Sequence, residues 1–154
     1  MSVFLLDVNV LLALAWSNHQ QHEAAHAWCA RQRRFRWASC PTTQSAFVRI
    51  SMQPAIVKRN LSGTDALELL VQNLKRPGHE FWAEDRPTDE VLGAFRARLV
   101  GHQQVTDACL LSLAIRHKGK LATFDQAVLA LVAPDAPEIQ HITIIPASAE
   151  PIGK

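Results

Sequence analysis

The chain has 154 residues, of which 48% are hydrophobic, and its formal net charge of +2 permits an anionic partner without requiring one. A chain of this length forms one domain and buries about 68–70% of its unfolded surface, so it needs no disulfide to complete a core. Its three cysteines show no C-x-x-C spacing, which argues against a disulfide framework or a cysteine metal site. No apolar run approaches the roughly 18 residues that span a bilayer. The apolar N-terminus contains Asp7 and lacks a basic lead, unlike a signal peptide, so we expect a reduced, cytoplasmic protein.

Apolar runs and turn residues divide the chain into alternating strands and helices. In chain order, strands are predicted at residues 3–6, 36–40, 80–82, 120–125 and 141–145, and helices at 8–16, 21–34, 43–52, 62–74, 88–99, 104–115 and 126–132. Gly119 is expected to be the C-cap of the helix at 104–115. Strands separated by helices favour a parallel α/β sheet with helices on both faces. We therefore predict a single α/β domain over residues 1–146, with a mainly parallel sheet of about five strands, and a short loose tail at 147–154.

The first predicted strand is a run of four apolar residues, 3–6, that ends at Asp7. Such a run is typical of a strand buried on both faces of a parallel sheet. The Asp7 carboxylate is suited to cap the following helix, because it can accept the free N–H groups of the first helical turn. Asp7 would then lie at the carboxyl end of a central strand, where open α/β sheets bind ligands.

Two further aspartates occupy comparable positions: Asp125 directly follows an apolar strand, and Asp107 lies in the first turn of the helix at 104–115. Because strand ends and helix starts lie on the same side of a parallel sheet, these carboxylates and Asp7 can converge. Converging carboxylates repel one another unless a cation neutralises them, and oxygen ligands suit Mg²⁺ or Mn²⁺. Such a metal can activate water and stabilise charge on a phosphoryl group. Taken singly, each aspartate is more often a helix cap or a turn residue; the combination of the three favours a metal site.

Four segments, in their order along the chain, carry a resemblance to a known family. They are residues 5–12 (LLDVNVLL), 40–50 (CPTTQSAFVRI), 105–114 (VTDACLLSLA) and 121–125 (LATFD). With these segments the chain resembles the PIN-domain nucleases and, within them, the VapC-type toxins of bacterial toxin–antitoxin systems. The resemblance extends over about residues 3 to 146.

The resemblance implies an endoribonuclease that depends on Mg²⁺ or Mn²⁺ and is held inactive by a small cognate antitoxin. Asp7, Asp107 and Asp125 fall on the family's acidic metal-site positions. Asn9 and Thr123 match polar residues beside that site, where they would orient carboxylates or the attacking water, and Thr42 matches less firmly. The resemblance also implies a homodimer and an antitoxin peptide that offers a basic residue to the acidic site. Exposed Trp or Leu faces on the first helices are expected to bind that partner.

One position departs from the family pattern. Where many members carry a glutamate on the third helix, this chain has Gln44. An amide keeps the hydrogen-bonding shape, but it binds a divalent cation more weakly and cannot act as a general base. We interpret Gln44 as an auxiliary group of a variant site. The alternative is a PIN-like module that binds RNA or an antitoxin without cutting.

Basic residues gather near the end of the second predicted helix. They are Arg31, Arg33, Arg34 and Arg36, with Phe35 and Trp37 between and after them. This cluster is either a solvated helix end, where positive charge is favourable, or a patch that contacts RNA phosphates. Arg49 is expected to pair with a helix carboxylate.

Two other motifs compete with the nuclease interpretation. His22-Glu23-Ala24-Ala25-His26 fits H-E-x-x-H, in which two histidines of one helix bind Zn²⁺, but no third ligand follows in a suitable pattern, and a solvated helix explains it. A phosphatase of the haloacid dehalogenase kind also begins with a strand and an aspartate. It needs a second aspartate two residues later, where this chain has Asn9.

Overall fold

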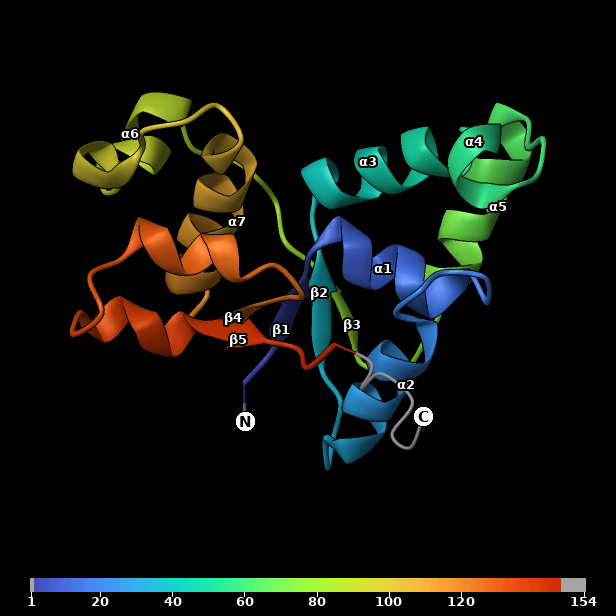
Figure 1. Ribbon diagram of the computed structural model, residues 1–154, viewed down its shortest axis with the longest axis horizontal. Coiled ribbons are helices and arrows are strands. Elements are labelled where there is room, and N and C mark those ends of the chain that lie inside the picture. The colour runs from blue at the N-terminus through green and yellow to red at the C-terminus, as the bar shows by residue number, and fades with distance from the viewer. Residues whose placement is uncertain (1, 148–154) are drawn as a thin grey trace, which may run out of the picture.

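The computed structural model describes residues 2–147, with five parallel strands at the centre (Figure 1). The strands are β1 (Phe4–Leu6), β2 (Trp37–Ser39), β3 (His79–Phe81), β4 (Lys120–Thr123) and β5 (Ile142–Ile144). Their order in the sheet is β3-β2-β1-β4-β5, and every neighbouring pair is parallel. The predicted α/β class with a mainly parallel, five-stranded sheet is confirmed. The predicted tail at 147–154 lies, except for its first residue, outside the described part of the chain.

Helices cover both faces of this sheet. They are α1 (Val8–Ala15), α2 (His22–Arg31), α3 (Pro41–Ser51), α4 (Pro54–Val57), α5 (Gly63–Leu74), α6 (Thr88–Gly93) and α7 (Gln104–Arg116), with the 3-10 turns η1 (Arg96–Arg98), η2 (Gln126–Leu131) and η3 (Pro137–His141). Figure 1 shows α6, α7, η2 and η3 on one side of the sheet, and α1 to α5 on the other. Among the helices at residues 2–147, none has the length and apolar character that crossing a membrane requires.

Each face of the sheet has its own hydrophobic core, and neighbouring residues of a strand contribute to different cores. In β1, Leu5 packs with α7 and η2, whereas Leu6 packs with α1, α2 and α3. In β4, Leu121 and Ala122 divide in the same way. Side chains of a strand alternate between the two faces, so a strand covered by helices on both faces must be apolar throughout. The uninterrupted apolar run before Asp7 therefore follows from the central position of β1.

The helix boundaries differ from the prediction in places. The predicted helix at 88–99 is broken: α6 ends at Gly93, a poor helix residue, and the turn η1 follows. The segment at 126–132 is a 3-10 turn. Neither α4 nor η3 was predicted, although each begins with a proline, Pro54 and Pro137. Proline stops the preceding helix but also suits the first position of a new one, because it has no N–H to leave unpaired.

Gly119 has a different role from the one expected. The left-handed residue after α7 is Lys118, with φ 56°, and Gly119 follows it with its N–H donating to the carbonyl of Ala114 at 2.9 Å. A Cβ on Gly119 would lie 2.5 Å from the carbonyl oxygen of Val3 and 2.7 Å from the ring of Trp82. Glycine is required here by the close approach of neighbouring groups, not by the backbone conformation.

Candidate metal and active site

Asp7 lies at the carboxyl end of β1, at the point where the order of the strands reverses. From β1 the chain adds β2 and β3 on one side, whereas β4 and β5 lie on the other. In open α/β sheets, ligands bind in the crevice at such a switch point. The Asp7 Oδ1 atom accepts the backbone N–H of Val8 at 2.7 Å and caps α1, and only 8% of the residue is exposed.

Thr123, the last residue of β4, hydrogen-bonds to two of the predicted site residues, Asp7 and Asp125. Its Oγ1 donates to Oδ2 of Asp7 at 2.9 Å and accepts the backbone N–H of Asp125 at 3.1 Å. Asp125 in turn accepts the backbone N–H of Ala127 at 2.9 Å and caps η2. The structure therefore brings Asp7, Thr123 and Asp125 together across the gap between β1 and β4.

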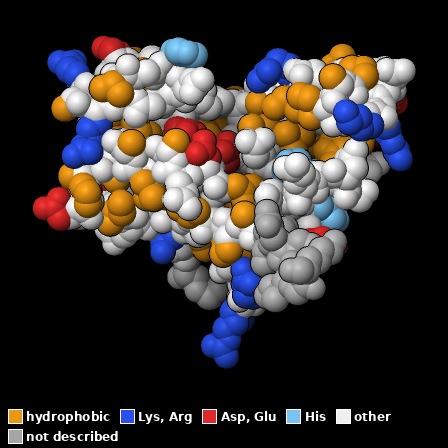
Figure 2. Space-filling model, in the orientation of Figure 1, with side chains coloured by type: hydrophobic (Ala, Val, Ile, Leu, Met, Phe, Trp, Pro, Cys, Tyr) orange, Lys and Arg blue, Asp and Glu red, His pale blue; other side chains and the backbone are white. Residues whose placement is uncertain are grey.

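Asp107 reaches the same place from the first turn of α7. Burial, together with the charges of Asp7 and Asp125, raises the pKa of Asp107 from 3.8 to about 6. Burial also raises the pKa of Asp7, assisted by the charge of Asp125 and opposed by the hydrogen bonds from Thr123 and Val8. The three carboxylates are thus close enough to repel one another. Figure 2 shows acidic side chains gathered in the hollow between the α7 side and the α3 side of the molecule.

The chemistry of these donors fits a hard divalent cation. Carboxylate oxygens are the preferred ligands of Mg²⁺ and Mn²⁺, and a bound cation would relieve the repulsion that, together with burial, raises the pKa of Asp107. Among residues 2–147, no three His, Cys, Asp or Glu side chains form a ready-made metal cage. Mg²⁺ does not require one, because it keeps several waters and is held through about one or two carboxylates.

Two other predicted site residues lie on neighbouring helices. Asn9 is exposed on the first turn of α1, beside a pocket of about 150 Å³ between α1 and the α3–α4 region. Gln44 is half-buried on α3, and its Nε2 donates to Oγ of Ser39 at 2.9 Å. Over the described range, neither side chain hydrogen-bonds to the three aspartates.

The sequence prediction missed three residues around Gln44 and the start of α3. Ser39 Oγ lies 2.7 Å from Nε2 of His79, which extends the hydrogen bond from Gln44 to a third side chain. Glu84, in the loop after β3, accepts the backbone N–H of Thr42 at 3.2 Å and its hydroxyl at 2.8 Å. No local spacing connects these residues, because β2 and β3 are neighbours only in the folded sheet.

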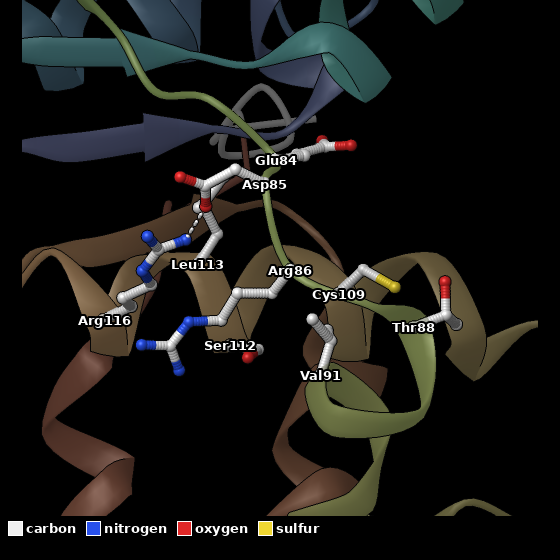
Figure 3. A pocket seen from close by; sticks show the side chains of 9 residues that line it. All are labelled: Glu84, Asp85, Arg86, Thr88, Val91, Cys109, Ser112, Leu113 and Arg116. Carbon is white, nitrogen blue, oxygen red and sulfur yellow. Dashed lines mark hydrogen bonds and ion pairs between the residues drawn. The ribbon is translucent and has the colours of Figure 1, made fainter.

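A pocket of about 190 Å³ lies on the other side of α7 (Figure 3). Its walls come from the 84–88 loop, α6 and α7, and the loop residue Asp85 forms an ion pair with Arg116. At about 100° per residue, Cys109 and Arg116 lie on the side of α7 opposite to Asp107. This pocket is therefore separate from the acidic site.

The predicted basic cluster does not lie beside the acidic site. Arg36 directly precedes β2, so it belongs to the amino edge of the sheet, opposite to Asp7, and it pairs with Glu80. The neighbouring Arg33 and Arg34 are exposed. This placement favours a solvated helix end. The expectation for Arg49 is wrong: the two ion pairs within residues 2–147 are Arg36–Glu80 and Arg116–Asp85.

The two histidines of the H-E-x-x-H motif hydrogen-bond to carbonyl groups at the C-terminal end of α1. Beyond the last backbone hydrogen bond of this helix, the carbonyls of Ala13 and Leu14 need other donors. His22 Nδ1 lies 2.7 Å from the Ala13 oxygen, and His26 Nε2 lies 2.9 Å from the Leu14 oxygen. Both imidazoles are therefore used in joining α2 to α1, which supports the structural interpretation of this motif.

The expected Trp or Leu faces on the first helices are not exposed. The leucines of α1 are buried, Trp28 of α2 is 5% exposed, and the half-buried Trp16 donates through Nε1 to Ser51 Oγ at 3.2 Å. That expectation is wrong, because α1 is covered by α2 and α3. Exposed apolar side chains lie instead between the end of α3 and α5: Met52, Ile56, Leu67 and Val71.

Comparisons with known proteins agree with this architecture. The family model for the PIN domain matches residues 4–133. Ribonuclease VapC44 of Mycobacterium tuberculosis (strain ATCC 25618 / H37Rv) is 41% identical over 141 residues, which are 92% of this chain and 98% of that protein. Ribonuclease VapC38 of the same strain is 39% identical over 145 residues, covering 92% and 99% of the two chains.

A solved structure has the same fold. The crystal structure of PAE2754 from Pyrobaculum aerophilum superposes with a TM-score of 0.56, at 21% identity, over 85% of each chain. The matched residues 4–133 include all three aspartates of the acidic site. From its family match and its identity to these relatives over most of its length, the chain belongs to the PIN domain family and to the VapC-type ribonucleases within it.

Proposed function

We propose that the protein is a metal-dependent endoribonuclease of the VapC toxin type, which hydrolyses RNA phosphodiester bonds. The observation that carries this proposal is the convergence of Asp7, Asp107 and Asp125 at the strand-order switch point, where burial and the charges of the other two aspartates raise the pKa of Asp107 to about 6. The names of the relatives, each a ribonuclease, supply the reaction class.

Asp7, Asp107 and Asp125 would hold Mg²⁺ or Mn²⁺. Such a cation, when bound, activates water and stabilises charge on the phosphoryl group. Thr123 holds the Asp7 carboxylate in one orientation through its hydrogen bond of 2.9 Å. Asn9, in the first turn of α1, and Gln44, near the start of α3, would act as auxiliary polar groups that orient water or RNA.

The test is cleavage of total cellular RNA by the purified protein, with Mn²⁺, then Mg²⁺, then EDTA. Asp107→Asn is the informative variant, because Asp107 caps no helix and the change preserves its shape. Asp135→Asn is the matched control, since Asp135 is exposed and lies in the loop before η3. We expect metal-dependent cuts that disappear only in Asp107→Asn. Cleavage that persists in this variant, or in EDTA, would contradict the proposal.

A second candidate is a PIN-like module that binds RNA or an antitoxin without cutting. Gln44 favours it, because an amide replaces a carboxylate that many family members have. Gln44→Glu separates the two candidates. A competent nuclease should change little when this charge is introduced, whereas a defective one should become active.

We also propose a small cognate antitoxin, a homodimer and a cytoplasmic location. The uncompensated acidic site suits a peptide that offers a basic side chain, which would pair with Asp107 and Asp125. Cys29, Cys40 and Cys109 are all free thiols, as in a reducing compartment. Co-purification from the native host tests for the antitoxin, and light scattering of the free protein tests for the homodimer. A monomer without an associated basic peptide would contradict both proposals.

A further inference from the structure

The Gln44 carboxamide has one bonded end and one free end. Its Nε2 donates to Oγ of Ser39 at 2.9 Å, while Oε1 has no hydrogen-bond partner among residues 2–147. No side-chain oxygen or nitrogen that is fully buried in this range lacks a partner, so Oε1 must be open to solvent. The carbonyl end is therefore the free end of this side chain.

The direction of the next hydrogen bond, between Ser39 and His79, depends on the tautomer of His79. Ser39 is fully buried, and its hydroxyl accepts the proton of Gln44 Nε2. A continuous chain of hydrogen bonds forms when the Ser39 hydroxyl donates its single proton to Nε2 of His79, 2.7 Å away. His79 accepts it only as the neutral tautomer that carries its proton on Nδ1. Burial, opposed by the charge of Glu80, lowers the pKa of His79 and so favours the neutral ring.

His79 is fixed in position by the strand next to β2. It pairs with Trp37 in the β2–β3 ladder, and the centroids of the two rings are 4.5 Å apart. From this place its ring reaches along the sheet to Ser39, the last residue of β2. Because β2 lies beside β1, Ser39 and the amide of Gln44 are one strand away from the end of β1, where Asp7 begins α1.

We infer that Ser39 and His79 are positioning residues that hold the Gln44 carboxamide with Oε1, not its NH₂ group, free to face the acidic site. An oxygen can bind a divalent cation or its water, whereas an NH₂ group presents protons and repels the cation. This inference rests on the proposed function, since it needs a cation at the three aspartates. It also explains how a glutamine can serve where a glutamate is common: a carboxylate has two equivalent oxygens and needs no orientation, but a carboxamide does.

The test measures Mn²⁺ affinity by calorimetry on the metal-free protein, without RNA. Ser39→Ala is prepared in two backgrounds, the natural chain and Gln44→Glu. Loss of an outer hydrogen bond to a metal site costs about 10-fold or more in affinity. We expect a loss of about 10-fold for Ser39→Ala in the natural chain and less than about twofold in Gln44→Glu. Equal losses in both backgrounds would indicate a merely structural role, and no loss in either would overturn the inference as well.

Variants of His79 provide an independent measurement if Ser39→Ala does not fold. His79→Gln keeps an acceptor for the Ser39 hydroxyl, whereas His79→Phe keeps the ring but removes the acceptor. We expect His79→Gln to bind Mn²⁺ like the natural chain and His79→Phe to show the full loss. Nitrogen-15 NMR should find His79 neutral with its proton on Nδ1; a proton on Nε2 would reverse the chain of hydrogen bonds and overturn the inference.

The same calorimetry separates this inference from the proposed function. If the natural chain binds no Mn²⁺, or if the natural chain and the Asp107→Asn variant bind Mn²⁺ equally well, the proposed metal site is wrong. The inference about Ser39 and His79 is then wrong as well. If Asp107→Asn abolishes binding but the Ser39 and His79 variants behave like the natural chain, only the positioning role is wrong.

Discussion

The Thr123 hydroxyl donates a 2.9 Å hydrogen bond to the Asp7 carboxylate across 116 positions of the chain. Both residues are buried, at 2% and 8% exposed. The same hydroxyl also accepts the backbone N–H of Asp125. One side chain thus sets the relation between β1, β4 and the turn after β4, and it does so at the acidic site.

Replacing Thr123 with valine should therefore affect both stability and the site. Valine has nearly the same shape but no hydroxyl, so a buried oxygen of Asp7 and the N–H of Asp125 lose their partner. We expect a loss of about 1–3 kcal/mol in the free energy of unfolding, measured by urea denaturation, and weaker Mn²⁺ binding. Thr123→Ser keeps the hydroxyl and should retain most of both; equal losses in the two variants would assign the effect to packing.

The raised pKa of Asp107 predicts an unusual pH dependence of stability. Its pKa is about 6 in the folded chain against 3.8 for an ordinary aspartate, so the folded state holds the extra proton between these values. This stabilising contribution is complete below about pH 4 and is lost as the pH rises through about 6. A shift of two pKa units is worth about 3 kcal/mol for a fully buried group. We expect about 1–2 kcal/mol here, because Asp107 is only half-buried and solvent screens its charge.

Urea denaturation in EDTA from pH 4 to 7 measures this contribution. Asp107→Asn should reduce the decline, leaving the part that Asp7 contributes in the same direction. Asp135→Asn, on the surface, should keep the full decline. Mn²⁺ at pH 7 should restore stability to the natural chain, because the cation replaces the lost proton as the compensating charge. An unchanged decline in Asp107→Asn would show that its carboxyl is not coupled to its neighbours.

The histidines of the H-E-x-x-H motif should matter for stability and not for catalysis. His22→Ala removes the side-chain donor to Ala13, whereas after His26→Ala the carbonyl of Leu14 still accepts from Arg76 at 3.1 Å. We expect a loss of about 1–2 kcal/mol for His22→Ala and less for His26→Ala, with RNA cleavage per folded molecule unchanged. A requirement for Zn²⁺ and His22, independent of Asp7, would instead favour the zinc-enzyme interpretation.

Two glycines provide a matched pair of alanine substitutions. A Cβ at Gly119 would lie within 2.7 Å of both Trp82 and the Val3 carbonyl, whereas a Cβ at Gly93 meets nothing within 4 Å. We expect Gly119→Ala to destabilise the fold by about 1–3 kcal/mol through overpacking. Gly93→Ala, at the end of α6, should stabilise it by up to about 1 kcal/mol. Thermal melts of both variants test this; similar melting temperatures would mean that β4 can shift to make room.

Local patterns were sufficient for the sheet and for the acidic residues. The run before Asp7 predicted a buried parallel strand, because apolar side chains on both faces have no other stable environment than between two helical layers. Asp7, Asp107 and Asp125 were recognisable because each stands where a strand ends or a helix begins. Each of these patterns occupies only a few consecutive residues of the chain.

The hydrogen bonds among the polar side chains at the ends of the strands depended on contacts between distant segments. Ser39 and His79 meet only because β2 pairs with β3, and the bond between Thr123 and Asp7 forms only because β4 lies beside β1. The arginines after α2 lie before β2, at the amino ends of the strands. The acidic site lies at the carboxyl ends, so these arginines are far from it whatever their charge. Spacing along the chain thus determined the strands and the identities of the acidic groups. Strand order, which no local pattern encodes, decided which polar side chains hydrogen-bond to one another there.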